Sequence, residues 1–286
     1  MQLPSLEIMI ATCGPDGADK AAAMLLPETP GISYSISWQD SGNAPAPVQL
    51  LGRRDVALLR LEGRGLSRNR NNLLRHASAD LLMVADDDLR LLPDGLQQAR
   101  RIFAENPELD FGIFQYASDI PKEYPAETCT LARLPKHFFP SSIEMILRRE
   151  PRAGRLRFNE DFGLGAPRIT AGEEDLLLKR ARKAGLDCRF FPVTLSYHPG
   201  YTTGVQPKLS RGSIISRGVI AAVETPLTAP LRVPLCAWRI ARKGQYNFFR
   251  ALLLCCEGAL RGYFSPSLRR YLKGKQPAES GPTKIN

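Results

Sequence analysis

Short apolar segments alternate with amphipathic, helix-length segments along the first part of the chain. Strands of a parallel sheet that is buried on both faces read as nearly continuous apolar runs, whereas the covering helices repeat apolar positions every three or four residues. The pattern therefore predicts an α/β fold, with a mainly parallel central sheet and helices on both faces. The predicted strands are Leu6–Ala11, Ser33–Gln39, Val56–Leu61, Leu81–Ala85, Phe111–Gln115 and Cys188–Pro192, and the predicted helices include Asp16–Leu26, Ser67–Ala77, Pro93–Asn106 and Glu173–Ala184.

The pattern changes near Gly204 and divides the chain into three parts. Residues 1–205 carry the predicted sheet, residues 206–275 form a basic region that we expect to be helical, and residues 276–286 read as a disordered tail. With 43% hydrophobic and 24% charged residues, a chain of 286 residues can bury a sizeable core. The segment 121–140 contains four prolines, and we expect it to wrap the functional site as irregular structure.

Three consecutive carboxylates, Asp86, Asp87 and Asp88, follow the predicted strand Leu81–Ala85. Open α/β sheets bind ligands at the carboxyl ends of their strands, so these side chains lie where a ligand is expected. Crowded carboxylates repel one another unless a cation lies among them, and hard oxygen ligands suit Mg²⁺ or Mn²⁺. Such an ion keeps coordination positions for water and a substrate diphosphate. A solvated turn produces an isolated Asp-x-Asp by chance, so the surrounding motifs decide between the two interpretations.

A second acidic cluster, Glu173-Glu174-Asp175, follows Gly172 and opens a predicted helix. Carboxylates in the first turn of a helix complement its dipole, which is the purely structural interpretation. The alternative is that one of them is a general base.

Both clusters belong to an ordered set of motifs. The segment Gly65–Asn71 (Gly-Leu-Ser-Arg-Asn-Arg-Asn) precedes the three aspartates; Phe158–Gly165 (Phe-Asn-Glu-Asp-Phe-Gly-Leu-Gly) precedes the second cluster, and Arg180–Gly185 follows it. This order resembles family 2 glycosyltransferases of the GT-A fold, of the bacterial surface-polysaccharide type. The resemblance covers residues 6–205 and implies a GT-A-like domain that binds a nucleotide-sugar donor.

The resemblance also implies roles for residues on the donor side. Asp86 would contact the ribose or belong to the metal site as a ligand or through a metal-bound water. Asp88 would hold the Mn²⁺ or Mg²⁺ that bridges the two phosphates, while Asp87 faces structure. Asp40 matches an aspartate that hydrogen-bonds the uracil, although an Asp-Ser-Gly turn at a strand end is also a common structural turn. Thr12 lies in the loop that frames the nucleotide.

Arg68 and Arg70 lie beside the glycine turn that leads toward the acidic site. Either side chain can pair with Asp86 or reach a diphosphate through charge-assisted hydrogen bonds. A solvated or ion-paired helix face is the alternative.

The catalytic base has two candidates. Inverting transfer needs a carboxylate that takes the proton of the acceptor hydroxyl. Alignment backward from Arg180–Arg182 puts Glu174 where the family has its catalytic Asp, and Asp175 is the base if the helix begins one residue later.

His198 follows the strand-like segment Val193–Tyr197 and opens a His-Pro-Gly turn. Several GT-A enzymes place a C-terminal histidine near the metal or the diphosphate. The resemblance therefore makes His198 a candidate metal ligand or phosphate contact, and the alternative is a capped turn.

These motifs predict an inverting, metal-dependent glycosyltransferase that moves a hexose from a nucleotide donor, best matched by a UDP-sugar. Its acceptor would be a glycan or a lipid-linked glycan in cell-surface polysaccharide biosynthesis. A sugar-phosphate nucleotidyltransferase is the alternative enzyme, but it would carry a glycine-rich basic loop after the first strand, which the segment Ala11–Pro15 lacks. A basic nucleic-acid-binding module is the non-enzyme alternative. We expect no nucleic-acid partner, because the sheet domain shows no basic and aromatic interleaving.

The positive charge lies at the C-terminal end. Residues 226–286 hold eleven Lys and Arg against two acidic residues, in a chain whose formal net charge is +10. The segment between Tyr246 and Phe264 predicts an amphipathic helix, and no uncharged run approaches the roughly 20 residues that span a bilayer. This helix either packs on the sheet or a second subunit, or lies on an anionic membrane surface. Its predicted apolar side consists of Phe249, Leu252, Leu253, Cys256 and Leu260, and its basic flanks of Arg239, Arg242, Lys243, Arg269, Arg270, Lys273 and Lys275.

The N-terminal segment Leu6–Ala11 is too short for a signal peptide and has no basic stretch before it. The six cysteines are scattered and lack paired metal-ligand spacing, which is typical of reduced thiols. We therefore expect a cytoplasmic protein, peripheral on the inner face of the cell membrane if the C-terminal helix binds lipid.

Overall fold

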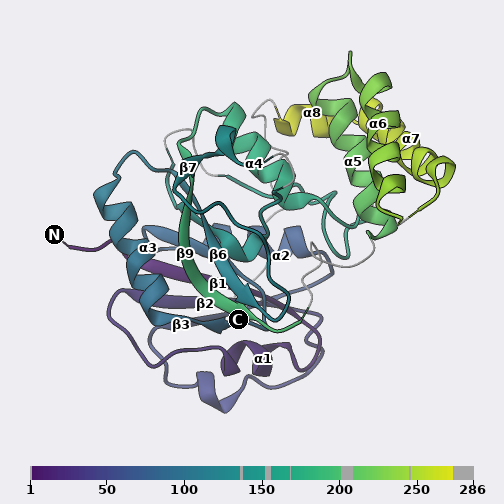
Figure 1. The fold of residues 1–286 in the computed structure, drawn as a ribbon. Coiled ribbons are helices and arrows are strands. Elements are labelled where there is room, and N and C mark those ends of the chain that lie inside the picture. Colours follow the sequence, from purple (N-terminus) through teal and green to yellow (C-terminus); the bar gives the residue numbers. More distant parts are fainter. Residues whose placement is uncertain are drawn as a thin grey trace.

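A computed structural model describes residues 2–135, 138–151, 156–167, 169–200, 209–244 and 246–272. Within these residues the chain forms one mixed sheet, helices on both faces of it, and a group of helices at one side (Figure 1). The predicted α/β class with a helical C-terminal region is confirmed.

The strand order in the sheet is β3-β2-β1-β4-β8-β6-β9-β5, and β7 pairs with β9. Strands β3, β2, β1 and β4 are parallel neighbours, as are β6 and β9. Strand β8 is antiparallel to both β4 and β6, and β5 and β7 are antiparallel to β9. The strands are β1 Leu6–Cys13, β2 Ile32–Gln39, β3 Val56–Leu61, β4 Leu81–Ala85, β5 Arg90–Leu91, β6 Phe111–Ser118, β7 Cys129–Thr130, β8 Met145–Arg148 and β9 Cys188–His198.

All six predicted strands are present, and the last one extends to His198. The antiparallel strands β5, β7 and β8 were not predicted, because two to four residues carry too little periodicity to detect. The segment 121–140 is largely irregular where it is described, apart from β7 and the 3₁₀ turn Leu131–Arg133.

Four helices cover the sheet: α1 Gly17–Ala23, α2 Leu66–His76, α3 Pro93–Glu105 and α4 Glu173–Lys183. Helix α1 ends earlier than predicted; Pro27 follows closely and disfavours helical geometry in the residue before it. Side chains of β1 alternate between two cores, as the pleat of a strand requires. Ile8 and Ile10 pack with α1 and α3, whereas Met9 and Ala11 pack with α2 and α4. The prediction of helices on both faces is therefore confirmed.

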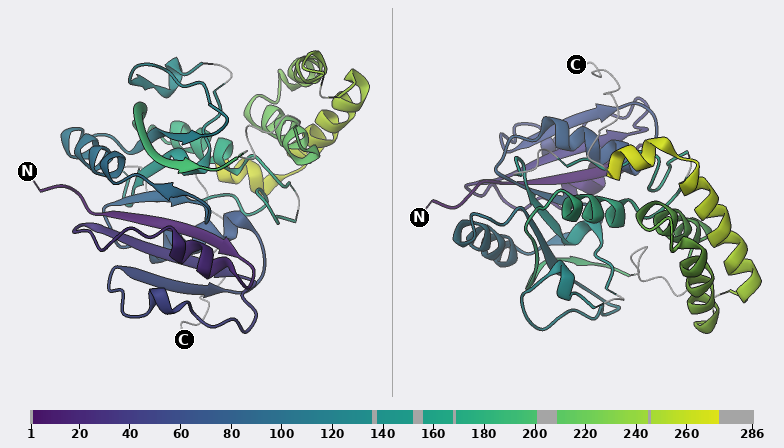
Figure 2. Two further views of the ribbon diagram at one scale, coloured as in Figure 1. Left: turned by 60° about the horizontal axis from the view of Figure 1, so that its bottom comes forward. Right: turned by 90° about the horizontal axis from the view of Figure 1, so that it is seen from above.

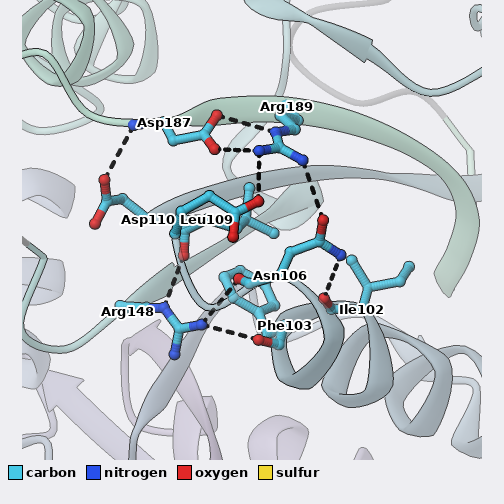
Figure 3. Close-up of polar contacts among 9 residues, drawn as sticks. Ile102, Phe103, Asn106, Leu109, Asp110, Arg148, Asp187 and Arg189 are labelled. Atoms are coloured by element: carbon cyan, nitrogen blue, oxygen red, sulfur yellow. Dashed lines mark hydrogen bonds and ion pairs between the residues drawn. The ribbon is translucent and has the colours of Figure 1, made fainter.

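Two arginines hold the amino ends of β6 and β9 (Figure 3). The guanidinium of Arg148 donates to the carbonyl oxygens of Phe103, Asn106 and Leu109 at distances of 2.7 to 3.2 Å. Arg189 pairs with Asp187 and also donates to the side-chain oxygen of Asn106. These contacts anchor the end of the sheet that lies opposite the carboxyl ends of its parallel strands.

The C-terminal helices form a bundle that Figure 2 shows from two further directions. They are α5 Arg211–Glu224, α6 Ala229–Arg242, α7 Phe248–Tyr263 and α8 Pro266–Leu272. Helices α5 and α7 cross closely at Gly218 and Gly258, where an added Cβ would lie 2.0 Å from a carbonyl oxygen of the opposite helix. The bundle joins the sheet domain through α5 and α8. Ile215 and Val219 of α5 pack with Leu176 of α4. Arg180 of α4 donates to the carbonyl oxygen of Tyr271 at 2.6 Å.

Several predicted features fall outside the described residues: the domain boundary at 205, the segment 276–286, and Lys273 and Lys275. Among the described helices, none combines the length and the apolar character needed to cross a membrane.

Candidate active site

The predicted donor-side residues meet at the carboxyl ends of three neighbouring strands. Thr12 lies near the end of β1, Asp40 follows β2 and Asp86 follows β4. Because β2, β1 and β4 are adjacent and parallel, the structure brings these three positions to one edge of the sheet. This is the edge at which open α/β sheets bind their ligands.

Asp40 occupies a tight turn at that edge. Its φ of 53° is left-handed, a conformation that aspartate and asparagine adopt more readily than most residues. Its carboxylate pairs with Arg64 at 2.6 Å, and 46% of the side chain is exposed. Asp40 therefore presents a partly solvated carboxylate beside the end of β1.

The first two aspartates of the triplet turn to protein partners. Asp86 accepts a hydrogen bond from Nη2 of Arg70 at 2.9 Å. Asp87 accepts a short hydrogen bond from the hydroxyl of Thr12, which ties the triplet to β1. Both carboxylates remain partly exposed.

The third aspartate lies against His198. Strand β5 pairs with β9 so that Arg90 is opposite Tyr197, and this register brings the preceding Asp88 beside His198. Oδ2 of Asp88 lies 3.3 Å from Nε2 of His198, and the other ring nitrogen, Nδ1, is buried without a hydrogen-bond partner among the described residues. Burial raises the pKa of Asp88; the charge of His198 opposes this shift, and its two aspartate neighbours add to it.

Arg70 connects the two acidic clusters. Its side chain is only 1% exposed. Besides Asp86, its guanidinium contacts Oε1 of Glu173 at 3.2 Å and the hydroxyl of Ser142 at 2.7 Å. Oε1 of Glu174 lies 3.6 Å from Nη1. One buried cation thus holds carboxylates from the end of β4 and from the start of α4, and negative charge remains in excess around it.

The polar face of α2 explains why Arg70 is buried. Asn71 forms hydrogen bonds with both backbone groups of Phe158, at 2.8 and 3.0 Å, and Ser67 donates to the carbonyl oxygen of Phe162 at 2.6 Å. The segment 158–164 therefore covers α2 and encloses Arg70. The motifs at Gly65–Asn71 and at Phe158–Gly165 are adjacent in space.

Glu174 faces the Arg70 cluster from the first turn of α4. The helix begins after Gly172, whose φ of 92° suits glycine. The side chain of Glu174 is 22% exposed. Burial raises its pKa to about 8, the charge of Glu173 adds to the shift, and Arg70 opposes it.

Asp175 is engaged differently. Its carboxylate pairs with Lys179 one helical turn further along α4, and the same Lys179 lies 3.9 Å from Glu224 of α5. Of the two candidate bases, only Glu174 is within ion-pair distance of Arg70 among the described contacts.

Asp88 and His198 fit a divalent metal ion that takes few protein ligands. Within the described ranges, no three His, Cys, Asp or Glu side chains are grouped to hold a metal. The Asp88–His198 pair offers one carboxylate oxygen and one ring nitrogen 3.3 Å apart, in a region of excess carboxylates. This donor set suits Mn²⁺ or Mg²⁺, whose remaining positions go to water and phosphate oxygens. Asp86, also predicted as a metal ligand, is held by Arg70 through one of its oxygens.

Comparisons with known proteins bear on the identity of this site. Residues 43–162 match the model of glycosyl transferase family 2, and this range contains Arg70 and all three aspartates. The fold is similar to a crystal structure of S. aureus TarS 1–349, with a TM-score of 0.58 and 13% identity over 96% of this chain and 93% of that chain. The predicted resemblance to family 2 glycosyltransferases is therefore confirmed over residues 43–162.

Two further TarS structures are similar to this chain. TarS 1–349 in complex with UDP-GlcNAc gives a TM-score of 0.54 at 13% identity, over 96% of this chain and 93% of that chain. A longer TarS structure gives 0.51 at 12% identity, over 93% of this chain and 55% of that chain. No curated protein matches the chain.

Two residues that contact Arg70 were not among the predicted site residues. Glu173 was assigned no role of its own, although it is buried against the guanidinium. Ser142 lies in a capping box, in which Ser141 and Glu144 bond reciprocally. The Ser-x-x-Glu spacing of that box is visible in the sequence and could have drawn attention to this segment.

Proposed function

We propose that this glycosyltransferase is an inverting, metal-dependent hexosyltransferase. It would use a nucleotide-sugar donor, a UDP-hexose, and a glycan or lipid-linked acceptor in cell-surface polysaccharide biosynthesis. The observation that carries the proposal is the bridge made by Arg70, which joins Asp86 at the donor edge of the sheet to Glu174 on α4.

The donor would lie across the carboxyl ends of β1, β2 and β4. In the proposal Asp40 accepts a hydrogen bond from the base, Thr12 frames the nucleoside, and Asp86 contacts the ribose. The match of the fold to TarS 1–349, crystallised with UDP and with UDP-GlcNAc, supports a uridine donor.

Glu174 is the proposed general base. The acceptor oxygen forms a bond to the anomeric carbon from the face opposite the diphosphate, while the bond from that carbon to the diphosphate oxygen breaks. The proton of the acceptor hydroxyl passes to the Glu174 carboxylate, and the bonding electrons leave with the nucleoside diphosphate. The Lys179 pairing of Asp175 favours Glu174 over its neighbour.

Arg70 would position two carboxylates of the site, and the proposed metal ligands would bind the cation that offsets the negative charge of the diphosphate. Arg70 is buried and both of its terminal nitrogens contact protein side chains, which favours a role in positioning Asp86 and Glu174 over direct contact with the donor. Asp88 and His198 would hold Mn²⁺ or Mg²⁺, which when bound stabilises charge on the departing diphosphate.

We place the enzyme in the cytoplasm, where nucleotide sugars would be its donors. A lipid-linked acceptor would be presented at the inner face of the cell membrane. Peripheral attachment there would bring the site to its acceptor.

A binding screen tests the donor and the metal together. Melting temperatures are measured with a panel of nucleotide sugars, each with and without Mn²⁺, and release of nucleoside diphosphate is followed for those that stabilise the protein. We expect a UDP-sugar to stabilise the enzyme only with metal, because a ligand that binds only the folded state raises its stability. Stabilisation by nucleoside triphosphate and sugar phosphate, with release of pyrophosphate, would instead identify a nucleotidyltransferase.

A further inference from the structure

The exposed apolar surface of the enzyme is concentrated on two C-terminal helices. Of twelve large apolar side chains that are exposed in the described residues, eight lie between Leu227 and Phe264. This segment contains α6 and α7, which lie at one side of the sheet (Figure 1). Scattered exposed apolar residues are ordinary, but a concentrated group marks an interaction surface.

Helix α6 has an apolar outer face. It packs into the bundle through Val233, Ala237 and Ile240. At about 100° per residue, Leu231 and Trp238 fall on the opposite side of the helix from these buried positions. Leu231 is 77% exposed and Trp238 47% exposed.

Helix α7 repeats the same arrangement. Its buried side consists of small residues, including Cys255 and Gly258, that allow close contact with α5. Phe249 and Leu253, on the opposite side, are 74% and 71% exposed. Both residues belong to the apolar side predicted for this helix. Within the described part of the chain, the helix packs through its small residues on α5 and α6, and not on the sheet as one alternative expected.

The charged residues around these two faces are mostly basic. The segment 226–263 carries six Arg and Lys residues and one acidic residue, Glu257. Glu257 is paired with both Arg211 and Arg261, so it leaves no uncompensated negative charge. On α6, the guanidinium of Arg242 lies 4.9 Å from the ring centroid of Trp238. The six basic residues are Arg232, Arg239, Arg242, Lys243, Arg250 and Arg261.

We propose that the outer faces of α6 and α7 form a docking surface for an anionic lipid bilayer. We define this surface by Leu231, Leu235, Trp238, Phe249, Leu253 and Leu260. When an amphipathic helix lies on a bilayer, its apolar side chains insert at the boundary between headgroups and acyl chains. Basic residues beside them are attracted to anionic headgroups. The inference extends the proposed function, because it supplies the surface that would bring the enzyme to a lipid-linked acceptor.

Charge decides between a bilayer and a second copy of the chain. Two copies that met through this surface would bring like-charged basic residues together, with Glu257 already paired within each copy. Like charges that face one another across an interface oppose association. An anionic bilayer instead complements them.

Vesicle flotation tests the surface with the full chain. The protein is mixed with vesicles of phosphatidylcholine alone or with phosphatidylglycerol added, and the fraction recovered with the vesicles is measured at low and high salt. We expect binding only to the anionic vesicles, weakened by salt. The double variant Trp238→Ser/Phe249→Ser should lower recovery at least about fivefold, because it removes two apolar anchors.

A matched control keeps this result specific. Val48 and Leu51 are also exposed, at 77% and 65%, but they lie in the connection between β2 and β3. The double variant Val48→Ser/Leu51→Ser should bind vesicles as the unaltered protein does. Equal loss in both variants, or recovery that does not depend on phosphatidylglycerol, would overturn the proposal.

Tryptophan fluorescence gives an independent readout. The chain has two tryptophans, and Trp38 is buried while Trp238 is half exposed. We expect anionic vesicles to shift the emission to shorter wavelength, and brominated phosphatidylglycerol to quench it. No change in emission at saturating vesicle concentration would count against insertion of this surface.

Two measurements distinguish the membrane surface from a dimer interface and from the proposed donor chemistry. If sedimentation shows a dimer that Trp238→Ser/Phe249→Ser dissociates, and vesicles do not bind, the surface joins two copies and the membrane proposal is wrong. Asp88→Asn should lose metal-dependent donor binding while retaining flotation. Failure of flotation with intact donor binding rejects only the membrane surface, and the reverse result rejects only the proposed chemistry.

Discussion

The Nη2 atom of Arg70 lies 2.9 Å from Oδ1 of Asp86, and the guanidinium that makes this contact is enclosed by protein. Its other nitrogen, Nη1, lies 3.2 Å from Glu173. A buried ion pair adds little net stability compared with apolar residues, but removing one partner leaves a charge without compensation. Arg70 therefore makes the geometry of the donor edge depend on the start of α4.

Replacement of Arg70 by methionine should destabilise the fold. Arg70→Met leaves Glu173 buried without its cation, and we expect the free energy of unfolding to fall by about 3–5 kcal/mol. Urea denaturation measures this loss. Arg68→Met, two residues away on a more exposed side of α2, is the control and should change little. A similar loss in both variants would mean that the helix, and not the ion pair, was disturbed.

Glu174→Gln should separate catalysis from binding. We expect turnover to fall by at least about a hundredfold, the scale of general-base catalysis, with donor affinity within a few-fold of the unaltered enzyme. Asp175→Asn removes only a pairing with Lys179 and should retain most of its turnover. If Asp175→Asn shows the large loss and Glu174→Gln does not, Asp175 is the base.

The raised pKa of Glu174 predicts how activity depends on pH. Because its pKa is about 8 and not 4.5, the free enzyme carries this group mostly protonated at neutral pH. A base must be deprotonated, so kcat/KM should rise tenfold per pH unit below about 8 and level off above it. The profile is measured with saturating metal and with Glu174→Gln as the reference. A rate that is constant between about pH 6 and about pH 9 would contradict the assignment.

The same shift has the opposite effect on stability. A carboxyl group whose pKa is higher in the folded state binds its proton more tightly there, so it stabilises the fold at low pH. This contribution is lost as the pH rises from 4.5 through about 8. The free energy of unfolding of the unaltered protein should therefore decrease over this range relative to that of Glu174→Gln.

The sheet could be predicted from the sequence because its central strands are long apolar runs. The position of the three aspartates at a strand end followed directly from that pattern. The approach of Asp88 to His198 could not, because it depends on the two-residue strand β5 and its register with β9. So short a strand has no periodicity of its own.

The burial of Arg70 could not be predicted from the sequence either. Asn69, Arg70, Asn71 and Asn72 make one stretch of α2 strongly polar, and such a stretch normally faces solvent. Here all four residues are buried against other parts of the fold. Asn69 donates to Thr12 and Asn72 to Ser37, whereas Asn71 bonds to Phe158. Partners so far away in the sequence are beyond the reach of any local pattern.

The Asp88 and His198 pair predicts a graded response to metal. Asp88→Asn should abolish the Mn²⁺-dependent stabilisation by UDP while leaving the metal-free melting temperature nearly unchanged, because the Asp88 side chain is half exposed. His198→Ala should weaken this stabilisation less, since Asp88, the negatively charged ligand, remains. Asp87→Asn should have the smallest effect on metal binding, because Asp87 bonds to Thr12. Unchanged stabilisation in Asp88→Asn would show that the metal, if bound, lies elsewhere.

A second buried ion pair should fix the irregular segment 121–140. Nζ of Lys122 lies 2.7 Å from Glu144, whose side chain is fully buried, and burial lowers the pKa of Lys122 and raises that of Glu144. Lys122→Met leaves Glu144 without a cation and should lower the free energy of unfolding by about 3–5 kcal/mol. The pair Lys20–Asp16 has a similar distance, 2.8 Å, but both side chains are more than half exposed, so Lys20→Met should have almost no effect. The double variant Lys122→Met/Glu144→Gln should recover part of this lost stability, because it removes the uncompensated charge. A double variant no more stable than Lys122→Met would show that packing of the lysine stem is the larger contribution.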